Sequence, residues 1–199
     1  METENVPDGS EGRARAVVIT KFLNKKRGGA LRRDDARNLL RRTLESQRAR
    51  RGLVVHAWAF LPSKVVLLVQ LPAQRPLATS LGELFGYYTR RFNARYRRSG
   101  PVFRARFLKS VLFSDEEILR AIARIHAMPA EHEVEECAGA EPHCSRSVYL
   151  GTPDRITTPW VPGTTQRVST ASSDAPFAPL NFVDAENASD GSAGMVTER

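Results

Sequence analysis

The amino-acid sequence predicts an α+β domain of the ferredoxin-like class, in which helices pack on a mostly antiparallel four-stranded sheet. Three observations support this prediction. The hydrophobic period changes repeatedly along the chain and gives the order strand, helix, strand, strand, helix, strand, helix. A four-residue turn joins the second and third strands, as in an antiparallel hairpin. The chain of 199 residues is long enough for one domain with a substantial core and too short for two.

The first half of the chain contains three strands and a helix. Ala16 to Phe22 is a short β-branched run typical of a strand, and the Gly-containing stretch from Asn24 to Gly29 breaks it. A helix is predicted from Arg33 to Arg50. Its apolar stripe consists of Ala36, Leu39, Leu40 and Leu44. Leu53 to Phe60 and Val65 to Leu71 are the two strands of the predicted hairpin.

A longer amphipathic helix is predicted from Leu77 to about Arg95. Its apolar residues fall within about 120° of one another and are Leu77, Leu81, Leu84, Phe85, Tyr88, Phe92 and Tyr96. That face is expected to be core. Arg90 and Arg97 project from the opposite face, and Arg91 and Arg98 from one flank. Arg95 falls inside the stripe, so it either extends its charge outward along its stem or marks the helix end.

The last strand and helix follow a clear stop signal. Ser99-Gly100-Pro101 ends the preceding helix, and an extended segment is predicted from Val102 to Leu112. Ser114 and Glu117 have the spacing of a capping box, in which each side chain accepts a hydrogen bond from the other's backbone. A third helix is therefore predicted from this box to about Ala127.

Positive charge is concentrated in the middle of the chain. Residues 1–13 and 164–199 each carry a net charge of −3 and have few apolar residues, so we expect both segments to be disordered. Because the whole chain carries +8, residues 14–163 carry +14, and we expect them to form one nucleic-acid-binding domain. Most of this charge is arginine, whose planar fork matches phosphate oxygens. A concentrated field of this size favours nucleic acid over a merely soluble basic surface.

Other classes of protein are disfavoured. No stretch of eighteen apolar residues occurs and the acidic N-terminus does not resemble a secretory signal, so we expect a cytoplasmic protein without a membrane partner. Cys137 and Cys144 are too few for a disulfide-stapled fold. With His132 and His143 they do not match the spacing of a zinc knuckle, and adjacent His and Cys seldom chelate one ion, so no zinc site is expected.

The stretch from Gly86 to Lys109 contains eight basic residues and no acid. These eight residues, here called the basic strip, are Arg90, Arg91, Arg95, Arg97, Arg98, Arg104, Arg106 and Lys109. Tyr87, Phe103 and Phe107 are interleaved with them. Arginines bind phosphates and aromatic rings stack on unpaired bases, so the strip suits a hairpin or single-stranded nucleic acid. Strand alternation favours the two Phe as core and the adjacent Arg as surface. The alternative is a solvated arginine face.

Several motifs resemble one family of DNA-processing proteins. Residues 56–69, His-Ala-Trp-Ala-Phe-Leu-Pro-Ser-Lys-Val-Val-Leu-Leu-Val, are similar to the second and third strands of the REP-associated tyrosine transposases, in the HUH single-tyrosine superfamily. Further similar segments follow in matching order, and they are 87–93 with 100–107, 125–129, and 149–151 with 159–161. The resemblance covers about residues 15–163. It implies the single-tyrosine transposase fold, a DNA hairpin or single strand as partner, and a monomer or homodimer.

The same resemblance identifies the positions where that family performs chemistry. The family holds Mg or Mn with two histidines at i and i+2 on a strand, and here those positions are Lys64 and Val66. Its nucleophilic tyrosine is replaced by Arg124, and a polar residue four positions later by Met128. Arginine has no nucleophilic oxygen, and valine has no lone pair for a metal. We therefore expect no catalytic residue, no metal and no other cofactor, with Lys64 and Arg124 joining the basic strip as DNA-binding residues.

The leading hypothesis is a transposase-like protein that binds hairpin or single-stranded DNA without cutting it. An alternative is an active transposase with displaced catalytic residues, for which Tyr87, Tyr88 and Tyr96 are candidates. Tyr88 and Tyr96 lie on the apolar stripe and are more simply core. A further alternative is an RNA-binding or protein-interaction module on the same scaffold.

Overall fold

The structure is a computed structural model that describes residues 14–24, 30–70, 76–131 and 143–163. Its elements are β1 (Ala16–Phe22), the 3-10 turn η2 (Ala30–Arg32), α1 (Asp34–Arg51), β2 (Val54–Phe60), β3 (Lys64–Gln70), α2 (Leu77–Tyr96), β4 (Leu108–Leu112), α3 (Asp115–Glu131) and α4 (Arg146–Tyr149). The two charged ends and most of the predicted loop at 24–29 lie outside the described residues. None of the described helices is long and apolar enough to span a membrane.

The four strands form one antiparallel sheet in the order β2-β3-β1-β4. β1 lies at the centre because it pairs with β3 on one side and with β4 on the other. Thr20, for example, lies opposite Val66 on β3 and Leu108 on β4. This order with this connectivity is the ferredoxin-like arrangement, so the predicted fold class is confirmed.

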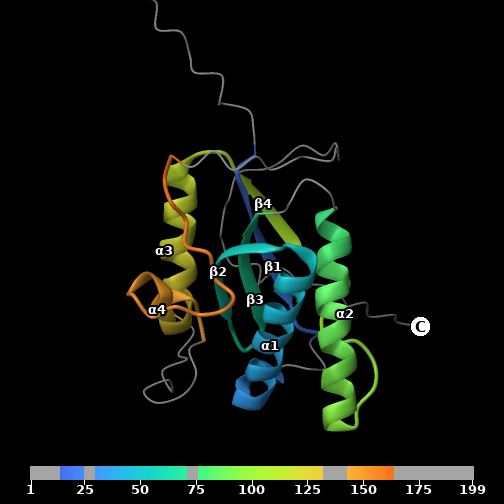
Figure 1. Cartoon of the computed structure of the whole chain (residues 1–199). Coiled ribbons are helices and arrows are strands. Elements are labelled where there is room, and N and C mark those ends of the chain that lie inside the picture. The colour runs from blue at the N-terminus through green and yellow to red at the C-terminus, as the bar shows by residue number, and fades with distance from the viewer. Residues whose placement is uncertain (1–13, 25–29, 71–75, 132–142, 164–199) are drawn as a thin grey trace, which may run out of the picture.

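Helices cover both faces of the sheet, as Figure 1 shows: α1 and α2 lie on one face and α3 on the other. β3 is buried on both sides as a result. Its odd-numbered residues Val65, Leu67 and Val69 belong to the core under α1 and α2, and its even-numbered residues Val66 and Leu68 belong to the core under α3. Strand alternation therefore assigns each apolar β3 side chain to one of two helix layers.

Helix α3 begins at the predicted capping box. The Ser114 hydroxyl accepts a hydrogen bond from the Glu117 amide at 3.2 Å, and the Glu117 carboxylate accepts one from the Ser114 amide at 3.2 Å. The helix is longer than predicted and continues to Glu131. Pro129 lies in this last stretch, and its position inside the helix concealed the true end from sequence reasoning.

Residues 143–163 cover the outer edge of β2, which is an edge strand of the sheet. The Phe60 amide donates to the His143 carbonyl at 2.8 Å, and the Ser145 amide donates to the Trp58 carbonyl at 3.0 Å. Farther along the same strand, the Thr158 amide donates to the Val55 carbonyl at 2.8 Å. The short helix α4 lies within this segment and was not predicted. Covering an edge strand in this way protects its backbone from pairing with another chain.

Side-chain hydrogen bonds fix the same segment to the rest of the domain. The Tyr149 hydroxyl donates to the His56 carbonyl at 2.9 Å and accepts from the Trp160 amide at 3.1 Å. The Trp160 indole then donates to Asp115 at 2.9 Å, and Asp115 also pairs with Arg15 at 3.0 Å. The chain after α3 is thus tied to β2, to the start of α3 and to the start of β1.

The predicted extended segment from Val102 to Leu112 is wrong in its first half. Only Leu108–Leu112 forms a strand, and residues 102–107 are irregular apart from one bridge between Leu23 and Phe103. Pairing with β1 continues from Leu108 onward. The cause is a mismatch in chain length, because residues 104–107 lie opposite only residues 21 and 22.

The capping box should contribute measurably to stability. We expect Ser114→Ala to lower the free energy of unfolding by about 1 kcal/mol, because the Glu117 amide loses its acceptor. Urea denaturation of the wild-type chain and the variant measures this difference. Ser63→Ala, at an exposed turn position, is the matched control and should change stability by less than about 0.5 kcal/mol. Equal unfolding midpoints for Ser114→Ala and Ser63→Ala would contradict the assignment.

Candidate nucleic-acid interface

The second half of α2 presents arginines around one aromatic ring. Arg90 and Arg91 are exposed, and their guanidinium carbons lie 5.9 and 5.6 Å from the centre of the Tyr87 ring. The buried stripe of the helix faces the sheet, as predicted. Cation–π contacts hold both guanidinium groups beside the half-buried ring while their donors stay at the surface. This arrangement combines phosphate donors with an aromatic face.

The end of α2 turns three further arginines outward. Arg97 adopts the left-handed conformation with φ of 49° and ends the helix, and Arg98 follows it at the surface. Asn93 fixes the following turn by donating to the Gly100 carbonyl at 2.8 Å. Arg95 reaches out of the apolar stripe to Asp35 at 3.5 Å, so the prediction that its charge extends outward is confirmed.

Residues 104–107 form a bulge between α2 and β4, here called the arginine bulge. Arg104 and Arg106 are exposed, whereas Phe107 is half-buried. The Arg104 amide donates to the Phe22 carbonyl at 2.9 Å, and its guanidinium lies 5.4 Å from the Phe22 ring centre. Phe103, just before the bulge, is a core residue that packs on Phe85, so it is not a stacking surface for bases. The predicted alternation of surface Arg and inward Phe holds although the strand does not.

Lys21 lies beneath the arginine bulge, and sequence reasoning missed it. Its side chain is 7% exposed, and its ammonium donates to the Ala105 carbonyl at 2.9 Å and to the Arg106 carbonyl at 3.5 Å. Burial lowers the pKa of this lysine. A signal was present in the sequence, because Lys21 follows Val17 and Ile19 at the two-residue period of a buried strand face.

The remaining predicted binding residues lie in different places. Lys64 is half-buried and lies opposite Phe22 across the β1–β3 pair, so it and Arg104 border the same ring at one end of the sheet. Lys109 is exposed on β4. Arg124 is exposed on α3, in the layer opposite α2. The structure thus joins Lys64 to the arginine bulge and separates Arg124 from the arginines of α2.

The resemblance places a metal site at three positions, of which two are apolar. Val66 is fully buried and Met128 is 3% exposed, and both belong to the core between the sheet and α3. Lys64, the third of these positions, carries a positive charge. A valine, a methionine and a lysine do not fit a divalent cation, which prefers oxygen and imidazole ligands.

Three of the chain's four tyrosines are held in the fold. Tyr88 is fully buried and donates to the Ala36 carbonyl at 3.3 Å, and burial raises its pKa. Burial also raises the pKa of Tyr96 and of Tyr149. The Tyr149 hydroxyl donates its hydrogen bond to the His56 carbonyl on β2. A nucleophile requires the opposite shift, toward easier deprotonation. Tyr87, by contrast, lies beside the exposed Arg90 and Arg91.

Histidines and cysteines do not assemble a site among the described residues. No group of three potential metal ligands occurs in the part of the chain that the structure describes, and His132 and Cys137 lie outside it. His126 contacts the Ser145 hydroxyl at 2.9 Å, but Ser145 is fully buried and therefore inaccessible to a substrate. Burial lowers the pKa of His126 to about 4, and the nearby Arg146 adds to the effect.

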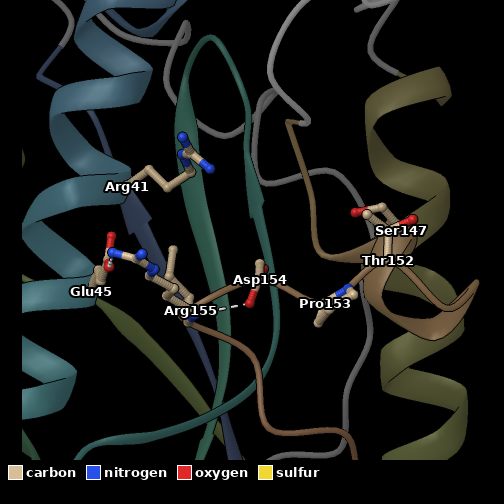
Figure 2. A pocket seen from close by; sticks show the side chains of 8 residues that line it. Arg41, Glu45, Ser147, Thr152, Pro153, Asp154 and Arg155 are labelled. Carbon is tan, nitrogen blue, oxygen red and sulfur yellow. Dashed lines mark hydrogen bonds and ion pairs between the residues drawn. The ribbon is translucent and has the colours of Figure 1, made fainter.

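A separate polar pocket of about 380 Å³ lies between α1 and the segment after α4, as Figure 2 shows. Arg41 and Glu45 line it from α1, and Asp154 and Arg155 from the opposite side. Arg155 pairs with Glu45 at 3.5 Å, so the positive charge is balanced within the pocket. Phosphate groups are repelled by such carboxylates, which makes the basic strip, where Arg95 is the residue paired with a carboxylate in the ion pairs described above, the better candidate interface.

Comparisons with known proteins place this fold. A solved structure of a REP-associated tyrosine transposase bound to a REP hairpin superposes with a TM-score of 0.56 at 16% identity, covering 82% of this chain and 94% of that one. This chain shares its fold with that transposase. A candidate transposase from Deinococcus radiodurans R1 has a TM-score of 0.44 at 16% identity, covering 63% of this chain and 97% of that one. No protein-family model and no curated protein sequence matches the chain.

The buried His126 predicts a defined pH dependence of stability. Its pKa is near 6.5 in the unfolded chain and about 4 in the folded one, so the unfolded state binds the proton first as pH falls. This contribution to stability is complete above about pH 6.5 and is lost progressively toward about pH 4. We expect His126→Gln to lose less stability than the wild-type chain between about pH 7 and pH 5, as measured by urea denaturation.

His143→Gln is the matched comparison for this experiment, since burial also lowers the pKa of His143. Each substitution should remove part of the acid-induced loss. An unchanged pH dependence in His126→Gln would show that this histidine is not protonated preferentially in the unfolded chain.

Proposed function

We propose that this chain is a transposase-like DNA-binding protein that recognises a hairpin or an adjoining single strand through its basic strip and does not cut the DNA. The observation that carries the proposal is the acid-free run from Gly86 to Lys109, whose arginines the fold holds at the surface. It combines phosphate donors on α2 and the arginine bulge with the half-buried Tyr87 ring. These are the two components that single-stranded nucleic acids require of a binding surface.

The shared fold supports DNA as the partner. The transposase structure that superposes on this chain is bound to a REP hairpin, and this chain covers nearly the whole of it. Fold alone does not specify function, so the proposal depends on the charged surface rather than on the superposition. The net charge of +14 on residues 14–163 supports it independently, because such a field draws polyanions to the protein.

The proposed absence of cutting depends on four side chains. Lys64 and Val66 stand where the resembling family has its histidine pair, and Arg124 stands where it has its nucleophile. Val66 and Met128 belong to the core between the sheet and α3. Restoring a metal site would require two new ligands inside an apolar core, where an unpaired polar group costs several kcal/mol. The scaffold is therefore adapted to binding.

Removing the two arginines of the bulge should weaken binding in a salt-dependent way. We expect Arg104→Ala with Arg106→Ala to lower affinity for a DNA hairpin with a single-stranded flank by roughly tenfold at about 0.1 M salt, and to reduce the slope of log K against log salt by about 1.4. Fluorescence anisotropy over a salt series measures both quantities.

Arg42→Ala with Arg50→Ala is the matched control, since it removes the same charge from exposed positions of α1 outside the strip. It should leave the slope closer to the wild-type value. Duplex DNA and RNA hairpins of the same sequence serve as competitors, and stronger competition by RNA would assign the surface to RNA. Undetectable binding of the wild-type chain at low salt would rule out the proposal.

No covalent product should form with DNA. We expect labelled single-stranded hairpin DNA, incubated with the chain and magnesium or manganese, to stay uncut and free of protein adducts on denaturing gels. An adduct would indicate an active transposase with a displaced nucleophile. Tyr87→Phe then identifies the residue, because Tyr87 is the tyrosine placed beside the arginines of α2.

A further inference from the structure

We infer that Lys21 is a positioning residue for nucleic-acid binding: it holds the arginine bulge in the one conformation that presents Arg104 and Arg106 together. This inference rests on the proposed function and extends it to a residue that does not itself reach the ligand. Lys21 lies on β1, 7% exposed, on the face that packs against α2.

The need for such a residue arises from the register of the sheet. The regular pairing of β1 with β4 ends at the pair Thr20 and Leu108. The next backbone contact between the two segments is the bridge between Leu23 and Phe103. Between these points four residues of one chain segment face two of the other, so regular ladder hydrogen bonds cannot continue. Carbonyl groups in such a bulge require other donors.

The Lys21 ammonium supplies these donors. It lies 2.9 Å from the Ala105 carbonyl oxygen and 3.5 Å from that of Arg106, so one group bridges two successive peptide units. The rings of Phe85 and Phe107 lie 5.7 and 5.9 Å from it on the core side. An ammonium has three donors and is attracted to aromatic faces, which explains why a cation is stable at this nearly buried position.

The fixed bulge determines where the two arginines lie. The Arg104 amide bonds the Phe22 carbonyl and its guanidinium lies over the Phe22 ring, while Arg106 follows at the surface. Without the Lys21 bridge, the peptide units between them would lose the interaction that selects one backbone path. Binding would then have to order the two arginines, and the lost conformational entropy would weaken their contacts with phosphate.

Hydrogen exchange in the free protein tests the positioning role without any ligand. We expect Lys21→Met, which keeps the apolar stem and removes the donors, to accelerate exchange of the Arg104 amide, which donates to the Phe22 carbonyl, by at least about tenfold. Peptides from β2 and β3 should exchange as in the wild-type chain. Unchanged exchange of the Arg104 amide would overturn the inference, even if the wild-type chain bound no DNA and the proposed function had failed.

A double-mutant cycle tests the link to binding. In the wild-type background, Lys21→Met should weaken hairpin binding by roughly tenfold and reduce the salt slope by about 1.4, as the loss of two phosphate contacts does. In a chain that already carries Arg104→Ala and Arg106→Ala, the same substitution should have almost no effect. Equal effects in both backgrounds would show that Lys21 does not act through the bulge.

Conservative variants separate positioning from general stability. Lys21→Arg keeps a cation with several donors and should restore both the slow exchange and the salt slope. Lys21→Gln keeps one amide donor without charge and serves in place of Lys21→Met if that variant does not fold. If Lys21→Arg folds but binds as weakly as Lys21→Gln, the bridge to Ala105 and Arg106 is not what positions the arginines.

Discussion

The burial of β3 on both faces is the constraint on which the rest of the structure depends. A strand that is apolar on both sides needs one helix layer above it and another below, and α1 with α2 and α3 provide these layers. The same alternation places Val66 in the core beneath α3. Valine at this position therefore contributes to the packing of the domain, and its apolar character is a structural feature of the fold.

The proposed binding of DNA without cutting involves side chains in different parts of the domain. Met128 and Val66 lie between the sheet and α3, whereas the arginines of α2 and of the bulge project from the surface on other elements. The proposed function therefore depends on the charged surface and is independent of the core packing beneath α3. Lys21 connects the interior of the domain with its charged surface. In the inference above, this nearly buried side chain on β1 fixes the path of the arginine bulge beside it.

Local sequence patterns predicted the elements that depend on local interactions. The strand Ala16–Phe22 and the hairpin agree with the structure, as does the capping box at Ser114, because period, turn and cap are set by neighbouring residues. The irregular segment before β4 was not predictable in this way, since it results from a mismatch with β1 far away in sequence. The edge contacts of residues 143–163 and the role of Lys21 are non-local for the same reason.

Photocrosslinking tests the central claim most directly. A DNA hairpin with a single-stranded flank that carries photoreactive bases would be irradiated with the full chain, and the attached peptides would be identified by mass spectrometry. The account predicts crosslinks within residues 86–109, with Tyr87 as the aromatic acceptor. Crosslinks confined to α1 and the pocket around Arg41 and Arg155, or no crosslinks under conditions where the chain binds DNA, would contradict it.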